Sequence, residues 1–326
     1  MNKTLIVSRE LCTQLLSVED CIPAMTETLT AAARGQVTML QRSMIPHDSG
    51  CKLAIMPATM VPRQVTGAKV IIFPGPAARG TSQGIVPLFD TETGALKAIV
   101  DAELITVVRT AATSGAATAI LAKQDAASAA ILGTGKQGRA HAKAMAAVRP
   151  IKTVYLWDQF PAAVEAAIAE LTPALPGVQL VACDTARQAV ADADIVCTTT
   201  SGRGGVVLEG SWLKPGAHIN AVGACSAAHR EVDTETVRRS KVYFDWKEAS
   251  LRDGGDLAIP VKAGEIGEDH FMGDLGLVTT GQLEGRTNDQ EITFFESVGL
   301  SVQDVAAANR IYETAKEKGL GVWVEI

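Results

Sequence analysis

The sequence predicts an α/β protein with a doubly wound parallel sheet and a separate α+β domain. From residue 128 to residue 245, short apolar runs alternate with stretches of helical periodicity, which is typical of parallel strands joined by crossover helices. The chain before this region is expected to form one helix, several strands and a long buried helix. We therefore predict an α+β domain from residues 1–122 with 300–326, and an α/β domain from residues 123–299.

In the α+β domain, the first predicted helix covers residues 17–33. Ser17 is a suitable N-cap, two acidic residues follow in the first turn, and Arg34-Gly35 ends the run. Glycine, proline and aspartate separate the β-like runs that come next. These predicted strands cover residues 37–46, 52–56, 68–73, 85–90 and 95–100, and a buried helix over 104–121 follows them.

In the α/β domain, strands and helices are predicted to alternate. The strands cover residues 128–132, 153–157, 178–182, 194–199, 217–222 and 241–245. The helices cover residues 137–148, 161–172, 185–191 and 233–240. At the end of the chain, a helix over 299–318 and a strand over 321–326 have no role in the parallel sheet, so they are expected to return to the first domain.

Composition narrows the functional classes. The net charge of −6 gives no electrostatic case for binding nucleic acid or an anionic membrane. The N-terminus MNKTLIVSRE lacks the apolar core of a signal peptide, and no uncharged apolar run reaches the roughly 18 residues of a membrane span. The six cysteines have no C-x-x-C spacing, which favours reduced thiols. We expect a cytoplasmic protein with no metal, nucleic-acid or membrane partner.

The first strand of the α/β domain leads into a glycine-rich turn, Ile131-Leu-Gly-Thr-Gly-Lys-Gln-Gly138. A G-x-G-x-x-G pattern between a strand and a helix is the fingerprint of a Rossmann-type dinucleotide-binding domain. The glycines permit a tight turn and a close approach of the backbone to a pyrophosphate, while the helix N-terminus offers its N–H groups. The predicted cofactor-binding residues of this turn are Gly133, Thr134, Gly135, Lys136, Gln137 and Gly138.

The second strand ends in Asp158, 25 residues after Gly133. An acidic residue near this distance typically bonds the ribose hydroxyls of NAD and repels the 2′-phosphate of NADP. Gln159 supplies no cation for that phosphate, although Arg139 is nearby. We therefore predict that Asp158 and Gln159 contact the cofactor, with NAD(H) preferred and NADP(H) as the alternative. A carboxylate that only caps its own loop is the other interpretation of Asp158.

Further cofactor contacts are expected at the carboxyl ends of the fourth and fifth strands, where an open α/β sheet binds its ligand. Thr199 and Thr200 follow the fourth strand, and Val222, Gly223 and Ala224 follow the core of the fifth. The alternative for the threonines is structural, because they are β-favouring residues whose hydroxyls also cap turns.

Several passages beyond the glycine turn carry a more specific signal. They are LQRSMIP with Arg42, AIMPA at 54–58, GAKVIIF with Lys69, LFDTETG at 88–94, ITVVRTAATSGAAT at 105–118, LGTGKQG at 132–138, WLKPGAHINAVGA at 212–224, REVD at 230–233, GDLG at 273–276 and FESVG at 295–299. Together they resemble the ornithine cyclodeaminase/mu-crystallin family, which also includes alanine dehydrogenases and cyclic imine reductases. The resemblance spans nearly the whole chain in order.

The resemblance implies a homodimer whose α+β domain binds the substrate and forms the dimer contact. It implies that Arg42 and Lys69 hold the carboxylate of a small amino-acid-like substrate, and that Arg109, with Thr110, lies beside the nicotinamide. The chemistry agrees, since a guanidinium pairs bidentately with a carboxylate and a buried lysine can donate a proton. Both Arg42 and Lys69 are predicted within apolar β-like runs, where the alternative is a pair of outward-facing strand charges. The pocket is also expected to include Met56, Phe73 and the turn of Ser297, Val298 and Gly299, with Ser297 on the cofactor side.

One position departs from the cyclodeaminases of this family. They carry an aspartate after Val-Gly-Gly as an acid/base group, whereas Val222-Gly-Ala-Cys-Ser226 places Cys225 there. A neutral thiol is a poor general base near neutral pH, because its usual pKa is about 8.5. Mu-crystallin, a ketimine reductase, has a small hydroxyl residue at this place. Cys225 is therefore expected to line the cofactor pocket, and His229 either reaches the same site or lies on the surface.

The sequence thus predicts an NAD(P)H-dependent reductase of a C=N bond next to a carboxylate. The expected substrate is a cyclic ketimine such as pyrroline- or piperideine-2-carboxylate. Lys69, Arg42 and Arg109 are the predicted catalytic residues, with Lys69 as the proton donor. The alternatives are an ornithine cyclodeaminase, an alanine dehydrogenase, and a cofactor-dependent binding protein for a small amphipathic ligand.

Overall fold

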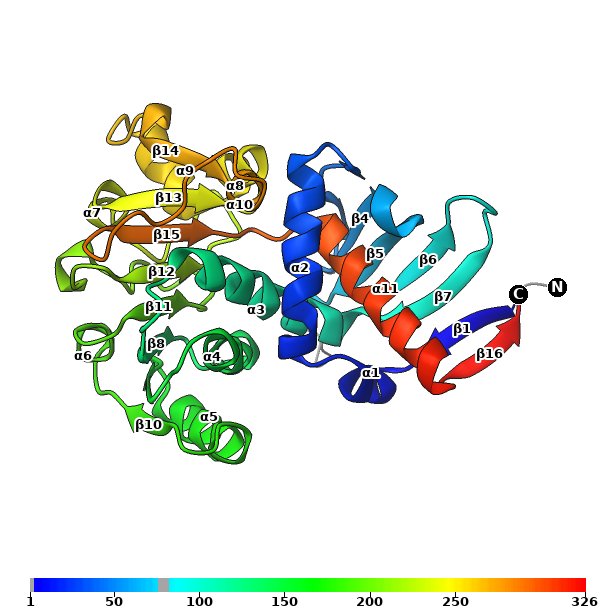
Figure 1. Cartoon of the computed structure of the whole chain (residues 1–326), viewed down its shortest axis with the longest axis horizontal. Helices are drawn as coiled ribbons and strands as arrows, with labels where there is room; N and C mark the ends of the chain where they lie inside the picture. The colour runs from blue at the N-terminus through cyan, green and yellow to red at the C-terminus, as the bar shows by residue number, and fades with distance from the viewer. Residues whose placement is uncertain (1–2, 76–81) are drawn as a thin grey trace. The chain divides into compact units, whose positions relative to one another are not determined.

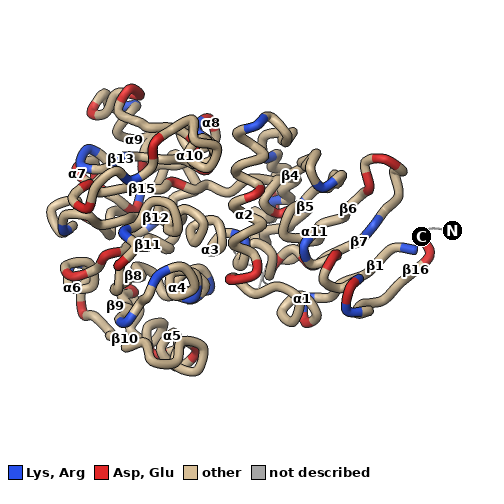
Figure 2. The backbone as a smooth tube through the Cα atoms, viewed as in Figure 1, with Lys and Arg blue, Asp and Glu red and all other residues tan. Residues whose placement is uncertain are grey.

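The computed structural model describes residues 3–75 and 82–326, and the chain divides into two compact units (Figure 1). The first unit consists of Met1–Arg109 and Leu300–Ile326, and the second of Thr110–Gly299. The division falls within one helix, α3 (Ala102–Leu121), whereas the sequence-based division places it after residue 122. Acidic and basic residues are interspersed in both units (Figure 2), as the small net charge suggests.

The first unit is built on an eight-stranded mixed sheet. Its strand order is β16-β1-β7-β6-β5-β4-β2, and β3 also pairs with β4. The strands are β1 (Lys3–Val7), β2 (Val37–Met39), β3 (Ser43–Pro46), β4 (Lys52–Met60), β5 (Val65–Phe73), β6 (Gln83–Asp90), β7 (Leu96–Asp101) and β16 (Val322–Glu325). The terminal strand β16 pairs antiparallel with β1, so the end of the chain returns to this unit as predicted.

Helices cover one face of this sheet. They are α1 (Arg9–Leu15), α2 (Val18–Ala33) and α11 (Ser301–Lys318), with a short 3-10 turn, η1 (Val61–Arg63), between β4 and β5. The side chain of Ser17 accepts the N–H of Asp20 at the start of α2, which confirms the predicted N-cap. Helix α11 packs between strands β4–β7 and α2, and its first three turns are almost entirely buried. The charged side chain at position 304, within the buried stretch 301–309, therefore lies inside the unit.

Helix α3 is the predicted buried helix. It is long and apolar enough to cross a membrane by length and composition alone, but most of it is buried inside the protein. Ala111, Ala112, Ala116, Ala117 and Leu121 are fully buried or nearly so. Their burial explains the apolar composition as that of a core helix.

The second unit contains an all-parallel sheet, as predicted, but with eight strands where the sequence predicted six. In spatial order they are β10 (Gln179–Ala182), β9 (Thr153–Trp157), β8 (Ser128–Leu132), β11 (Ile195–Thr198), β12 (His218–Ala221), β15 (Ile292–Glu296), β13 (Ser240–Phe244) and β14 (Phe271–Asp274). The order reverses at β8, which lies between β9 and β11. A doubly wound sheet binds its ligand beside such a switch point.

Helices and short 3-10 turns connect these strands. They are α4 (Lys136–Val148), α5 (Pro161–Ala174), α6 (Ala186–Val190), η2 (Gly210–Trp212), α7 (Thr234–Arg238), α8 (Lys247–Asp253), α9 (Gly255–Lys262), η3 (Glu268–His270) and α10 (Leu275–Thr279). Every strand and helix predicted here is present within two residues at each end. Strands β14 and β15 are the two strands of this sheet that the sequence analysis did not predict.

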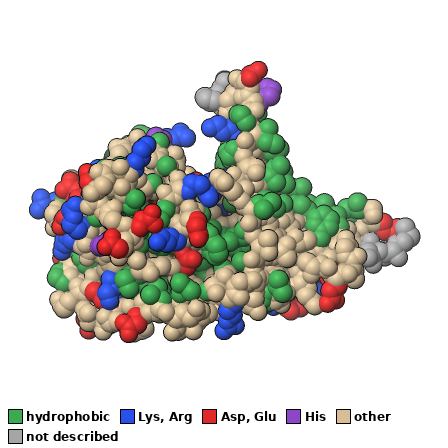
Figure 3. All heavy atoms as spheres, turned by 90° about the horizontal axis from the view of Figure 1, so that it is seen from above, with side chains coloured by type: hydrophobic (Ala, Val, Ile, Leu, Met, Phe, Trp, Pro, Cys, Tyr) green, Lys and Arg blue, Asp and Glu red, His purple; other side chains and the backbone are tan. Residues whose placement is uncertain are grey.

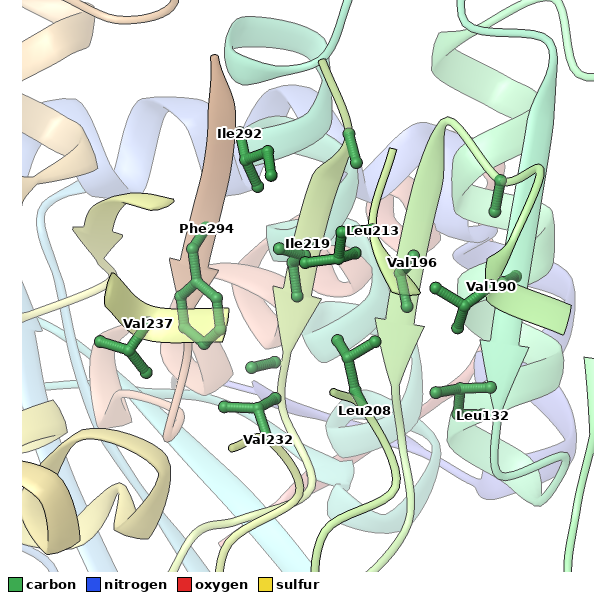
Figure 4. Close-up of a cluster of buried hydrophobic side chains, with 14 of the residues drawn as sticks. Leu132, Val190, Val196, Leu208, Leu213, Ile219, Val232, Val237, Ile292 and Phe294 are labelled. Atoms are coloured by element: carbon green, nitrogen blue, oxygen red, sulfur yellow. The ribbon is translucent and has the colours of Figure 1, made fainter. Parts of the chain in front are cut away.

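One row of buried side chains crosses the centre of this sheet. Val196, Ile219, Phe294 and Val242 are in register on β11, β12, β15 and β13 and point to the same face. They belong to a larger hydrophobic cluster that also contains Leu132, Val190 and Val237 (Figure 4). Strand β15 pairs with both β12 and β13, so it lies inside the sheet and not at its edge. Its Phe294 therefore fills the position between Ile219 and Val242 in this row.

The glycine turn depends on close packing of α4 against β8. A Cβ at Gly138 would overlap the backbone oxygen of Gly133, which itself has a φ of +97°.

We expect Gly138→Ala to lower the free energy of unfolding by about 1–3 kcal/mol, measured by urea denaturation. The control is Gly204→Ala, because a Cβ at Gly204 meets open space, and it should lower stability by less than about 0.5 kcal/mol. Equal losses in both variants would contradict this packing argument.

Candidate active site

Three buried charges meet inside the first unit. The carboxylate of Asp304 lies between two cations, with Oδ2 2.8 Å from Nζ of Lys69 and Oδ1 2.9 Å from Nε of Arg109. Gln303 Oε1 accepts a second hydrogen bond from Arg109 Nη1 at 2.8 Å. We call Lys69, Arg109, Gln303 and Asp304 the Lys69 cluster. It joins strand β5, helix α3 and the first turn of α11.

The Lys69 cluster carries one more positive than negative charge. Lys69 and Arg109 are each 4% exposed and Asp304 is fully buried. Buried charges are costly unless they are paired, and here one carboxylate is shared by two cations. The N-terminal turn of α11 adds a favourable dipole for Asp304. The remaining positive charge makes the cluster suited to receive an anionic ligand.

Burial lowers the pKa of Lys69 to about 8, and the positive charges of Arg109 and Arg42 act in the same direction. The charge of Asp304 and its hydrogen bond oppose this decrease. For Asp304, burial by itself would raise the pKa, but Arg109 and Lys69 lower it below its usual value. Lys69 can therefore exchange a proton near neutral pH, which an ordinary lysine with a pKa of about 10.4 cannot do readily.

Arg42 lies outside any strand, so its predicted position within one β-like run is wrong. Residues 40–42 separate β2 from β3, because Gln41 and its neighbours leave the ladder with β4. Arg42 is half-buried, while Leu40 and Ile45 beside it are mostly exposed. The apolar run around Arg42 is therefore a surface and not a core. The positive charge of Arg42 nevertheless contributes to the lowered pKa of Lys69.

Met56 is directly opposite Lys69 in the β4–β5 ladder, and both side chains are buried. Cross-strand partners share one face of a sheet, so Met56 supplies an apolar wall beside the lysine. Phe73 is four residues after Lys69 on β5 and is therefore on the same face, but it is 41% exposed. The structure thus brings Met56 to the Lys69 cluster and leaves Phe73 near the surface.

In the second unit, the glycine turn is held by Asp158. The N–H of Thr134 donates to Asp158 Oδ2 at 2.8 Å, and the N–H of Phe160 donates to Oδ1 at 3.1 Å. Gly135 is the N-cap of α4, and Lys136 and Gln137 form the first turn of this helix. Asp158 therefore does cap its loop. It is only half-buried, so its carboxylate can still accept hydroxyl groups from a ligand.

Arg139, the cation near Asp158 in the predicted cofactor site, forms hydrogen bonds to other groups of the protein. Its guanidinium donates to Glu170 Oε2 at 2.6 Å and to the backbone oxygen of Thr134 at 3.1 Å. Lys143 binds the other oxygen of Glu170 at 3.0 Å. Glu170 thus forms ion pairs with both Arg139 and Lys143. Gln159, beside Asp158, is exposed and neutral.

The threonines at the end of β11 use their hydroxyls internally. Thr199 Oγ1 donates to the backbone oxygen of Gly133 at 2.6 Å, and the Thr200 hydroxyl donates to Glu231. Their predicted alternative role, capping turns, is therefore present. Their N–H groups are bonded as well, that of Thr199 to the backbone oxygen of Leu132 at 2.8 Å and that of Thr200 to Glu231 at 2.6 Å. After β12, Val222 and Ala224 are buried, whereas Cys225 is exposed and its thiol donates to the oxygen of Val222 at 3.3 Å.

The turn after β15 is fixed by Asp245, which follows β13. Asp245 Oδ2 accepts the hydroxyl of Ser297 at 2.8 Å and the N–H of Gly299 at 3.0 Å. Val298 between them is buried, and Gly299 has a φ of +82°, which favours glycine. Ser297 is thus oriented by a buried carboxylate. Thr110 is a buried residue of α3.

Sequence reasoning missed Asp304, Gln303, Glu231 and Asp245. A signal for Asp304 was available, because it is the only charged residue among residues 301–309, a stretch of α11 that is rich in alanine and valine. Glu231 belongs to the REVD passage, which was noted without a role. Asp245 follows a strand of the parallel sheet directly, at the edge where ligands bind.

Comparison with known proteins decides the family. The sequence profile of the ornithine cyclodeaminase/mu-crystallin family matches residues 2–319. The chain belongs to this family. A Δ1-pyrroline-2-carboxylate reductase of Bacillus thuringiensis is 36% identical over 298 residues, covering 90% of this chain and 91% of the relative. The chain is accordingly an NAD-dependent oxidoreductase of the family.

Solved structures of the family share the whole fold. The Δ1-pyrroline-2-carboxylate reductase of Thermococcus litoralis, in complex with NADH and L-proline, aligns with a TM-score of 0.93 at 33% identity, covering 98% of this chain and 100% of that one. An archaeal alanine dehydrogenase dimer with bound NAD aligns with a TM-score of 0.91 at 29% identity, and each chain is covered completely. One of these two relatives thus binds NADH together with L-proline, and the other binds NAD.

The pairing of Asp304 with Lys69 can be tested by a double-mutant cycle. Asp304→Asn leaves two buried cations without their carboxylate and should lower the free energy of unfolding at pH 7 by about 3–5 kcal/mol. Lys69→Met removes one of these cations, so the double variant should be more stable than the sum of the single effects by at least about 1 kcal/mol. Urea denaturation measures all three variants.

The control for this cycle is the exposed pair of Arg238 and Glu235, whose side chains are about half exposed. Glu235→Gln should change stability by no more than about 0.5 kcal/mol. Additive effects of Asp304→Asn and Lys69→Met would show that the two side chains do not interact in solution.

Proposed function

We propose that this protein uses NADH to reduce a C=N bond next to a carboxylate, with a cyclic ketimine such as pyrroline-2-carboxylate or piperideine-2-carboxylate as substrate and an L-amino acid as product. The observation that carries the proposal is the Lys69 cluster, which combines a net positive charge with a lysine whose pKa is about 8. The reductases among the relatives support the choice of a cyclic imine.

The substrate's two polar groups match this cluster. Arg42 and Lys69 bind the carboxylate, and Arg109, held by Asp304 and Gln303, orients it. Lys69 donates a proton to the imine nitrogen as hydride arrives at the adjacent carbon, so that C=N becomes CH–NH. Asp304 keeps Lys69 protonated at neutral pH by opposing the effect of burial on the lysine pKa.

The glycine turn fits a dinucleotide. A backbone without side chains at Gly133 and Gly135, followed by the N-terminus of α4, suits a pyrophosphate. When bound, NADH supplies the hydride. Asp158 would accept the ribose hydroxyls, and the pairing of Arg139 with Glu170 leaves that cation occupied, which supports NAD(H) over NADP(H).

The cyclodeaminase alternative lacks its acid/base group. Cys225 is exposed, and its thiol donates to a backbone oxygen. A carboxylate is absent at this position of the sequence, so ring closure with loss of ammonia has no general base here. Alanine dehydrogenase is the second candidate, because the archaeal enzyme is 29% identical and has the same fold.

We also propose that the protein is a homodimer through the sheet of the first unit. Exposed apolar side chains gather on one face of the molecule (Figure 3). From β3, β5, β6 and the segment before β3, they include Leu40, Met44, Ile45, Ile72, Phe73 and Ile85. Contiguous apolar surface of this kind marks an interaction site. The alanine dehydrogenase relative is a dimer, which supports a second copy as the occupant.

The decisive experiment measures oxidation of NADH and NADPH by the purified protein with pyrroline-2-carboxylate, piperideine-2-carboxylate, pyruvate with ammonia, and ornithine. We expect NADH oxidation with a cyclic imine that does not require ammonia, and an at least tenfold lower kcat/KM with NADPH. Lys69→Ala should reduce the rate by about 10²–10⁴-fold. Ammonia release from ornithine without net NADH oxidation would support the cyclodeaminase, and an absolute requirement for ammonia would support the alanine dehydrogenase.

The rate of imine reduction should depend on the protonation of Lys69. Because the protonated lysine is the donor and its pKa is about 8, kcat/KM should decrease about tenfold per pH unit above pH 8. Asp304→Asn removes a charge that raises the pKa of Lys69, so this decrease should begin at a lower pH.

Lys69→Arg is the matched variant for the pH profile. Its guanidinium stays protonated to beyond pH 12, so whatever activity remains should show no decrease between pH 8 and pH 10. An unchanged pH profile in Lys69→Arg would assign the titration to another group.

A further inference from the structure

We propose that Glu231 is a positioning residue that ties together the two loops of the cofactor site, after β11 and after β12, and thereby fixes the loop that carries Cys225. This inference rests on the proposed cofactor site, but not on the identity of the substrate. Glu231 is a buried glutamate that the mechanism above does not use.

One carboxylate receives donors from both loops. Glu231 Oε1 accepts the N–H of Thr200 at 2.6 Å and also the Thr200 hydroxyl, and Oε2 accepts the N–H of Gly223 at 2.9 Å. Thr200 follows β11 and Gly223 follows β12, and these two strands are parallel neighbours. Glu231 therefore sets the separation of the loops at the end of the sheet where the cofactor binds.

The same carboxylate closes a loop of its own. The chain leaves β12 at Gly223 and returns at Glu231, and residues 225–228 between them are exposed. At the returning end, Asp256 Oδ1 accepts the N–H groups of Glu231 at 2.6 Å and of Val232 at 2.9 Å. The backbone around Glu231 is thus fixed by Asp256, and its side chain then fixes Gly223. Cys225 therefore lies in a segment, residues 223–231, whose first residue is bonded to Glu231 and whose last residue is bonded to Asp256.

Close packing at two glycines, Gly223 and Gly202, also holds the loops after β11 and β12 together. A Cβ at Gly223 would overlap both the backbone oxygen of Thr200 and the carboxylate of Glu231. Across the loop, a Cβ at Gly202 would lie 3.2 Å from the Cβ of His229, so the loop after β11 is packed on this segment as well. His229 is half-buried and contributes to packing between the loops, whereas the sequence left it either in the site or on the surface.

A buried carboxylate without a neighbouring cation is costly unless N–H and O–H groups stabilise it. Burial raises the pKa of Glu231, and the hydrogen bonds from Thr200 and Gly223 oppose this increase. Burial and the charge of Glu231 raise the pKa of Asp256 to about 8. Because Glu231 has donors on both oxygens, we assign the negative charge to Glu231 and the proton to Asp256. The negative charge is what makes both hydrogen bonds strong.

The test is Glu231→Gln, which keeps the shape of the side chain but turns an NH2 group toward the N–H of Gly223 or of Thr200. We expect weaker NADH binding, by about threefold or more in titration calorimetry, and a kcat lower by at least about tenfold. The KM for the imine should change by less than about threefold, since the Lys69 cluster is untouched. Amide hydrogen exchange should become faster in residues 223–231, in the absence of any substrate.

The matched control is Glu296→Gln. Glu296 is equally buried, at the end of β15, and among the described residues its carboxyl accepts no hydrogen bond from either loop. This variant should leave NADH binding, kcat and exchange in residues 223–231 within about twofold of the wild type. Losses in Glu231→Gln that do not exceed those in Glu296→Gln would overturn the proposal.

A second variant covers the case in which Glu231→Gln does not fold. Thr200→Val removes only the hydroxyl donor and keeps the N–H group, so about two- to fivefold losses in NADH affinity and kcat are expected, with faster exchange at Gly223. Wild-type exchange and NADH affinity in Thr200→Val would overturn the proposal. NADH binding and exchange need no imine, so these outcomes are distinct from failure of the proposed reaction.

Discussion

The first unit depends on how one buried carboxylate, Asp304, balances two buried cations. Asp304 is placed by helix α11, Lys69 by strand β5 and Arg109 by helix α3, so the ion pairs join elements far apart in sequence. The desolvation of three charges is offset only if their geometry is maintained. Because the four residues of the Lys69 cluster carry one more positive than negative charge, the same arrangement also suits an anionic ligand.

The second unit uses buried or half-buried carboxylates for a different purpose. Asp158 holds the glycine turn, Glu231 joins the loops after β11 and β12, and Asp245 fixes the turn of Ser297 and Gly299. Each accepts backbone N–H groups at the carboxyl ends of the parallel strands. Loops are usually the mobile part of an α/β domain. Here the three carboxylates fix the loops, and the hydroxyls of Thr199 and Thr200 form hydrogen bonds to Gly133 and Glu231.

Much of the fold could be predicted because local patterns and tertiary packing agree. The glycine turn, the alternating strands and helices, the N-cap at Ser17 and the buried helix α3 each have a signal within a short window. Strand β15 was missed although Ile292-Thr-Phe-Phe favours a strand, and nothing local indicates that it inserts between β12 and β13. Its Phe294 lies beside Ile219 of β12 and Val242 of β13, which are distant from it in sequence. Arg42 was misplaced for a related reason, because its apolar neighbours suggested a buried strand and form an exposed surface.

By itself, the sequence determined the fold class and the family, and it predicted a dinucleotide site, because these depend on residue types at fixed spacings. The spacings are those of three glycines, of an acid after the second strand, and of the passages with Arg42, Lys69 and Arg109. It also shows a cysteine, Cys225, at the place where the resemblance implies an aspartate in cyclodeaminases. Only the tertiary structure decided that Asp304 pairs with Lys69 and Arg109, and that Glu231 bonds Thr200 and Gly223. The physical reason is that the pKa of a buried group depends on its burial and its charged neighbours in space, and the chain separates Lys69 from Asp304 by more than two hundred residues.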